Sequence, residues 1–126
     1  MIALWLALGL AGGAAFAWAG RARPLAWWGA GLAVAAALYV AFALARGDLA
    51  HAAVEASGAA LYGAVAWVGV RQRRAGPVAL GWALHPVWDL GVHLGAGLPA
   101  PAWYVWACLS FDVLVGAALA ARVRGT

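Results

Sequence analysis

The chain contains no lysine, a single cysteine and only four acidic residues. Charged residues make up 10% of its 126 residues, whereas an average soluble domain has roughly 25%. Hydrophobic residues make up 67%, which is more apolar surface than a soluble protein of this length can bury. The composition therefore excludes an ordinary soluble domain and predicts an integral membrane protein. The one cysteine, Cys108, excludes an intrachain disulfide and any CxxC metal or redox motif.

The basic residues are all arginines, and the eight of them outweigh the four acids to give a net charge of +4. In a soluble protein such an excess suggests nucleic acid as a partner. These arginines stand instead in short gaps between apolar runs. They are therefore explained by membrane topology, and we predict no nucleic-acid partner.

Apolar runs long enough to cross the hydrocarbon core, which takes about 20 helical residues, occur five times in the chain. They cover residues 2–19, 25–45, 49–70, 78–95 and 102–121. We predict one all-α domain over residues 1–126, an integral membrane bundle of five transmembrane helices. Because the gaps are short, consecutive helices should be antiparallel neighbours. The main alternative is a four-span chain from which the first run is removed as a signal peptide.

The arginines divide unevenly between the two ends of these runs, with seven on one side and only Arg46 on the other. Because cytoplasmic loops carry the excess of arginine, we predict the N-terminus outside and the C-terminus inside. The predicted location is a bacterial inner (plasma) membrane, with the lipid bilayer as the first partner. In the first run, Gly9 and Gly13 form a GxxxG motif, which permits close helix approach within the bundle or in a homo-oligomer.

The most informative segment is HPVWDLGVH, residues 85–93. His85, Asp89 and His93 follow one another at a spacing of four, so a helix places all three on one stripe. Ionisable groups are costly within a bilayer, and such a stripe indicates function. The two histidines lie about 12 Å apart along the helix, so one ion cannot bind both of them.

The third and fifth runs carry ionisable residues at depths that match this stripe. Counting about 1.5 Å per residue from the outer helix ends gives three levels, at about 3–5, 10 and 15 Å. From the outside inward, the predicted pairs are His51 with His93, Glu55 with Asp89, and His85 with Asp112. The pattern predicts an outward-facing polar pocket between the third, fourth and fifth spans.

Imidazole and carboxylate groups together suit a divalent transition metal such as zinc or iron. The predicted metal ligands are His51, Glu55, His85, Asp89, His93 and Asp112. Without a metal the same groups suit acid and base chemistry, and the predicted catalytic residues are Glu55, Asp89 and His85. The residues predicted to contact a ligand are Trp88, Tyr62 and Cys108. Haem held between His51 and His93 is the weaker alternative, because acids line the same face.

These groups predict a metal-binding or acid/base site that acts on a small or lipid-soluble substrate; whether the protein is an enzyme stays open. One alternative is a non-enzymatic binder, or a proton-coupled carrier, of a small apolar or cationic ligand. A second alternative is a structural subunit of a membrane complex, in which polar hydrogen bonds hold the helices together.

The elements His85-Pro86-Val87-Trp88-Asp89…His93 and Trp103-Tyr104…Cys108-Leu109-Ser110-Phe111-Asp112 resemble those of a family of small bacterial integral membrane proteins with H-x-x-W-D-x-x-x-H and W-Y…C-x-x-F-D motifs. The resemblance covers the last two spans. It implies that one motif contains His85, Trp88, Asp89, His93, Cys108 and Asp112, and it implies no particular activity. Five spans and nine tryptophans are also similar to the tryptophan-rich sensory (translocator) proteins, and the His51-x-x-x-Glu55 pair looks like that of the sterol isomerase family.

Overall fold

The computed structural model describes residues 1–93 and 100–125. These residues form five α-helices and no strand, which confirms the predicted all-α bundle. The helices are α1 (Ile2–Gly20), α2 (Leu25–Ala45), α3 (Leu49–Arg71), α4 (Ala75–His93) and α5 (Ala102–Arg124). Their bounds follow the predicted runs closely, and the last two residues of the predicted fourth run lie outside the described residues.

The turn between α2 and α3 shows how the sequence sets the helix ends. Gly47 adopts a φ of 69°, in the left-handed region where glycine replaces other residues at little cost. The backbone N–H of Asp48 donates to the Ala43 carbonyl at 3.0 Å, which closes the end of α2 in a Schellman arrangement. The Asp48 side chain then accepts from the backbone N–H of His51 at 3.0 Å and caps the start of α3.

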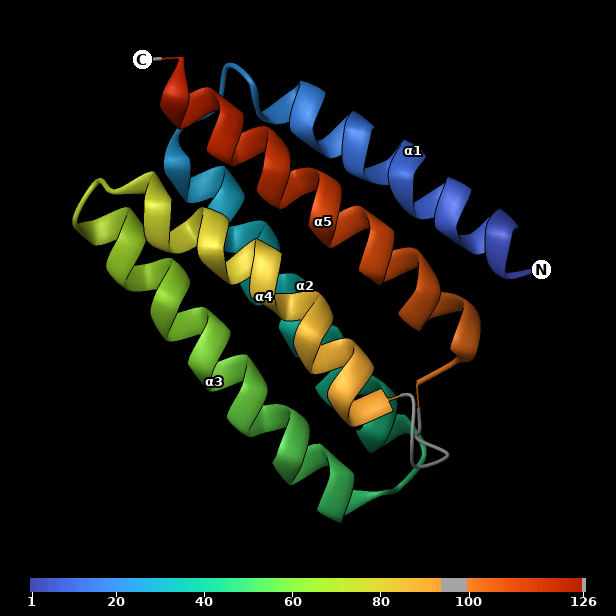
Figure 1. Cartoon of the computed structure of the whole chain (residues 1–126). Helices are drawn as coiled ribbons and strands as arrows, with labels where there is room; N and C mark the ends of the chain where they lie inside the picture. The colour runs from blue at the N-terminus through green and yellow to red at the C-terminus, as the bar shows by residue number, and fades with distance from the viewer. Residues whose placement is uncertain (94–99, 126) are drawn as a thin grey trace.

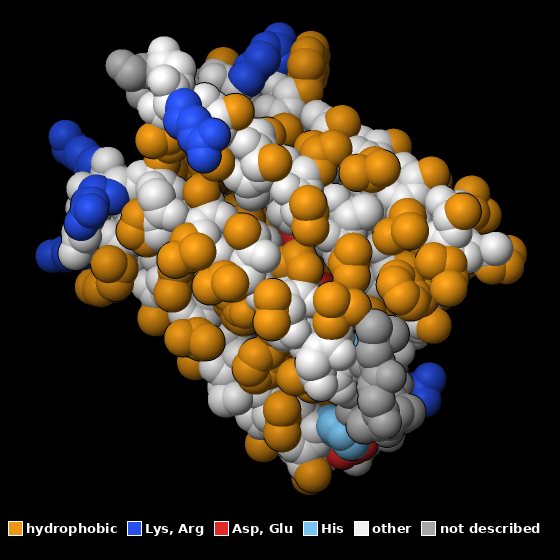
Figure 2. Space-filling model, in the orientation of Figure 1, with side chains coloured by type: hydrophobic (Ala, Val, Ile, Leu, Met, Phe, Trp, Pro, Cys, Tyr) orange, Lys and Arg blue, Asp and Glu red, His pale blue; other side chains and the backbone are white. Residues whose placement is uncertain are grey.

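Among the described residues, four helices are long and apolar enough to cross a membrane: α1, α2, α3 and α5. Helix α4 is not one of them, because the polar stripe of His85, Asp89 and His93 lowers its mean hydropathy. Large hydrophobic side chains are exposed along the outside of the bundle, and they cover most of the face seen in Figure 2. Such a continuous apolar surface is what a bilayer covers.

Helix α4 lies at the centre of the bundle, where it packs against α5, α3 and α2 (Figure 1). The consecutive pairs α2–α3, α3–α4 and α4–α5 are antiparallel neighbours, as predicted. Helix α1 departs from this rule. It packs along α5, in the same direction, and its contacts with α2, the next helix in the chain, are mainly those of Phe16 with Trp27 and Trp28.

Glycines bring α1 against α5. A Cβ atom at Gly9 would overlap the carbonyl oxygen of Ala107 and the hydroxyl of Ser110, and one at Gly13 would lie 3.1 Å from the carbonyl oxygen of Phe111. The Ser110 hydroxyl also donates to the Leu6 carbonyl at 2.8 Å. The GxxxG motif therefore serves packing within the bundle, while a homo-oligomer stays a prediction.

Arginine side chains gather at the end of the bundle where α1, α3 and α5 finish, and a single arginine follows α2 at the opposite end (Figure 2). At the arginine-rich end, the Arg21 guanidinium lies 3.8 Å from the ring centroid of Trp18. The Arg71 guanidinium lies 5.4 Å from that of Trp67. Paired arginine and tryptophan side chains at one level are typical of a membrane–water interface.

Helix α1 should leave α5 when Gly9 gains a side chain. We expect Gly9→Ala to lower the free energy of unfolding in detergent by about 1–3 kcal/mol, because the new methyl group has no space against the Ala107 carbonyl. Gly12→Ala is the matched control, since its Cβ would lie 3.4 Å from the Phe111 ring, an ordinary contact. Thermal unfolding of the two variants measures the difference, and equal melting temperatures would contradict the described α1–α5 contact.

Candidate functional site

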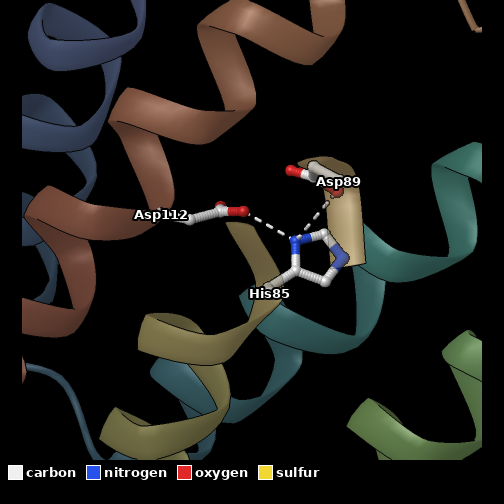
Figure 3. Close-up of side chains that lie close together, drawn as sticks. All are labelled: His85, Asp89 and Asp112. Atoms are coloured by element: carbon white, nitrogen blue, oxygen red, sulfur yellow. Dashed lines mark hydrogen bonds and ion pairs between the residues drawn. The ribbon is translucent and has the colours of Figure 1, made fainter. Parts of the chain in front are cut away.

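Three ionisable side chains meet between α4 and α5 in the middle of the bundle (Figure 3). The Nδ1 atom of His85 lies 2.6 Å from Oδ2 of Asp112 and 3.8 Å from Oδ1 of Asp89. The exposed fraction is 1% for His85 and 0% for both aspartates. We call these three residues the His85 cluster.

Helix geometry and a close helix crossing assemble this cluster. His85 and Asp89 are one turn apart on α4, on the face that α4 turns toward its neighbours. Asp112 reaches them from α5, where Gly116 lets the two backbones approach. A Cβ atom at Gly116 would lie 3.1 Å from the backbone nitrogen of Ala83. A larger residue there would push Asp112 away from His85.

The His85 cluster holds more acceptors than donors. Oδ1 of Asp112 and both carboxylate oxygens of Asp89 are buried without a hydrogen-bond partner among the described residues. The hydroxyl of Tyr39 lies beside the Asp89 carboxylate, and it too is buried without a partner of good geometry. A buried carboxylate without a partner is costly. The cluster therefore requires a proton or a bound cation to complete it.

All three tyrosines of the chain border the cluster. Tyr62 meets the His85 ring edge-on, with the ring centroids 4.8 Å apart. The Tyr39 ring lies 5.9 Å from that of His85, and Tyr104 lies 5.4 Å from Tyr39. Cys108, the predicted ligand contact, is half-buried beside Tyr104. Aromatic rings thus surround much of the cluster.

Tyr39 is a site residue that the sequence reasoning missed. It lies in the second span, which was not compared for depth with the third, fourth and fifth spans because it carries no histidine or acid. Tyr39 lies six residues before the end of α2, or about 9 Å from the helix end. The same depth count, applied to α2, would have placed its hydroxyl near the level of Asp89.

A second polar group lies toward the end of α4. Oε1 of Glu55 is 2.9 Å from Nε2 of His93, and both side chains are 2% exposed. The indole N–H of Trp88 donates to Oε2 of Glu55 at 3.1 Å. Gly58 makes room for that indole, since a Cβ there would lie 2.6 Å from the Trp88 ring. The Tyr39 ring stacks on His93 with centroids 4.2 Å apart, and so links this Glu55 pair to the His85 cluster.

The predicted pairing of His85 with Asp112 is confirmed. The prediction that Glu55 pairs with Asp89 is wrong, because Glu55 contacts His93. The depth count assumed that all helices end at one plane. His93 instead lies level with Glu55, which is six positions or about 9 Å inside α3, so the α4 stripe lies deeper relative to α3 than the count predicts.

His51 lies apart from both groups. Its Nδ1 atom is 2.5 Å from Oδ2 of Asp48, and its side chain is 34% exposed. The backbone N–H of His51 holds the pKa of the Asp48 carboxyl below its usual value. His51 therefore pairs with Asp48 and His93 with Glu55, so the two histidines do not form the predicted pair with each other. Among the described residues, the structure brings no facing pair of histidines together for haem. Of the six predicted metal ligands, the structure brings three together in the His85 cluster and two in the Glu55 pair.

Comparisons of the chain with protein-family models, curated proteins and solved structures find no match. The resemblance to small bacterial membrane proteins with the two-part motif stays a prediction. The function must therefore be inferred from the geometry and chemistry of the residues themselves.

The Glu55 carboxylate should stabilise the α3–α4 contact. Glu55→Ala removes the carboxylate beside His93 and leaves the Trp88 indole without its acceptor, so we expect it to lower the free energy of unfolding by about 1–3 kcal/mol. Glu55→Gln keeps an acceptor for Trp88 and should cost clearly less. Unfolding in detergent, followed by tryptophan fluorescence, compares the two. Equal losses would show that the negative charge, and not the hydrogen bond, carries the stabilisation.

Proposed function

We propose that the His85 cluster is an intramembrane site for a divalent transition metal, zinc or iron, and that it acts on a lipid-soluble substrate. The observation that carries the proposal is the donor set. One imidazole and two carboxylates offer ligand atoms that all lie within 4.8 Å of one another. Three of their carboxylate oxygens have no hydrogen-bond partner in the described part of the chain and require positive charge or protons. A divalent cation provides that positive charge.

The distances in the cluster fit such an ion after small side-chain movements. Zinc binds nitrogen and oxygen ligands at about 2.0–2.2 Å, so ligand atoms around one tetrahedral ion lie about 3.3 Å apart. The distances from Nδ1 of His85, 2.6 Å to Asp112 and 3.8 Å to Asp89, fall on either side of this value. Three protein ligands leave one coordination position open, which is typical of catalytic sites.

The chemistry follows from the ligands and their neighbours. A bound ion supplies Lewis acidity toward a substrate oxygen. Both carboxylate oxygens of Asp89 lack a hydrogen-bond partner of good geometry among the described residues, and the group lies beside the Tyr39 hydroxyl. One oxygen can therefore bind the ion while the other accepts or delivers a proton. The Glu55 pair lies nearer the C-terminal end of α4 than the His85 cluster. We assign it the role of positioning Tyr39 through the stacked His93 ring.

We infer that α4 crosses the membrane together with the four more apolar helices. Its outward face is a stripe of exposed apolar side chains, Leu80, Leu84, Val87 and Leu90, while its polar stripe is covered by protein. The arginine-rich end favours the cytoplasmic side. The Glu55 pair and then the His85 cluster would lie below the outer surface of a bacterial inner membrane.

A second candidate function is a proton-coupled carrier. It is favoured by the continuity of titratable groups from the Glu55 pair, through Tyr39, to the His85 cluster. Buried ionisable chains of this kind are typical of proton relays in transporters. Acidification of proteoliposomes after a pH jump would distinguish this function, since a metal site alone moves no protons across the bilayer.

Metal analysis of the purified protein tests the proposal. After incubation with Zn²⁺ or Fe²⁺ and removal of free ion, we expect about one metal per chain in the wild type and less than a tenth of that in Asp89→Ala and Asp112→Ala, because two ligands cannot retain the ion against dilution. His51→Ala and Glu55→Gln are matched controls that should keep the metal. Their retention shows that the losses are local to the His85 cluster.

Two results would overturn the metal proposal. The first is a wild-type protein that holds as little metal as Asp89→Ala. The second is a loss of metal in His51→Ala, which would place the ion at the Asp48 end of α3. Helix content and elution volume of each variant show whether the bundle is intact.

A further inference from the structure

A cavity of about 430 Å³ lies between α1, α2 and α5. Its volume falls within the range of about 300–1,000 Å³ that small-molecule sites occupy. The wall is formed mainly by hydrophobic and aromatic side chains, among them Leu8, Phe16, Val34, Leu38, Trp103 and Phe111. None of these residues belongs to the sequence-predicted site.

The cavity exists because α1 packs on α5 and leaves space between itself and α2. Phe16 closes the space toward the arginine-rich end, where its ring lies 5.3 Å from that of Trp27 and 5.6 Å from that of Phe111. Toward the other end, the rings of Trp5 and Trp103 lie 6.0 Å apart. Aromatic contacts thus bound the cavity along the bundle axis.

The open side of the cavity faces sideways, between α1 and α2. Leu8 on α1 is 52% exposed, and Val34 and Leu38 on α2 are 58% and 40% exposed, although all three line the cavity. In a bilayer these side chains contact lipid. A molecule that enters between them therefore comes from the hydrocarbon phase, where charged groups are costly.

The floor of the cavity is part of the His85 cluster. Asp112 is among the residues that line the cavity and is 0% exposed, so a ligand hydroxyl reaches it after a small shift of the neighbouring side chains. Its Oδ2 atom contacts His85, while its Oδ1 atom is buried without a hydrogen-bond partner among the described residues. An apolar pocket with one unpartnered acceptor selects for a molecule that brings one donor.

We propose that this cavity binds a lipid-soluble alcohol or phenol, which enters from the bilayer between α1 and α2 and donates a hydrogen bond to Asp112. The apolar wall accommodates the hydrocarbon part, and the neutral hydroxyl can cross the lipid where an ammonium group cannot. The proposal rests on the proposed function only in making this molecule the substrate of the His85 cluster, since binding itself needs no metal.

The test uses a hexadecanol that carries a photoactivatable diazirine, with the purified full chain in lipid nanodiscs. We expect saturable labelling of α1, α2 and α5 in the wild type. Ala35 lines the cavity, so Ala35→Phe fills it and should reduce labelling at least tenfold. The matched control is Ala37→Phe, because Ala37 is exposed on the same helix and lines none of the described cavities. It should label like the wild type.

The hydroxyl is tested with the corresponding hexadecane probe. A hydrogen bond to a carboxylate changes binding by about tenfold to a hundredfold, so the alkane should bind that much more weakly to the wild type. Asp112→Leu should remove this preference, because leucine offers no acceptor. Equal binding of alcohol and alkane to the wild type, or equal labelling of Ala35→Phe and Ala37→Phe, would overturn the proposal.

Two further measurements keep this test independent of folding and of the metal. If Ala35→Phe fails to fold, Leu8→Trp fills the cavity from α1, and Leu10→Trp is its exposed control on the same helix. Metal content separates the two proposals. Ala35→Phe should lose the alcohol and keep the metal, whereas Asp89→Ala should lose the metal and keep the alcohol.

Discussion

The cost of placing a charge in apolar surroundings is the constraint on which the rest of this bundle depends. A helix with two histidines and an aspartate on one stripe is stable in a bilayer only if protein covers the stripe. The structure provides this cover by placing α4 at the centre, with α2, α3 and α5 around its polar face. The three tyrosines then supply aromatic rings and hydroxyl groups around the His85 cluster. Packing and chemistry are therefore two results of one arrangement.

The arrangement of α1 adds the second component of the proposed site. Because its glycines fit the backbone of α5, α1 lies beside the last helix and leaves the space next to α2 unfilled. That space reaches Asp112, which is also bonded to His85. One carboxylate thus belongs to both a polar cluster and an apolar cavity, and the proposed entry of a ligand from lipid rests on this double position.

The sequence predicts some levels of this structure better than others. Helix bounds follow from apolar runs and from turn residues such as Gly47 and Pro101, because both act locally. The pairing of His85 with Asp112 also follows, because depth along a helix is a simple count. The contact of Glu55 with His93 does not follow from such a count, since it depends on how far α4 is shifted along its axis relative to α3. The cavity is beyond local reasoning altogether, because it depends on the contact of Gly9 with Ala107, almost a hundred residues later.

The placement of α1 also constrains the order of assembly. During synthesis the first helix is made long before α5, the partner whose surface matches its glycines. Helices α2 to α5 contain every residue of the His85 cluster and of the Glu55 pair, so both can form while α1 still stands apart. The packing of α1 on α5 then adds the cavity between α1, α2 and α5 to this polar centre. On this view, formation of the His85 cluster and the Glu55 pair is a separate step from formation of the cavity.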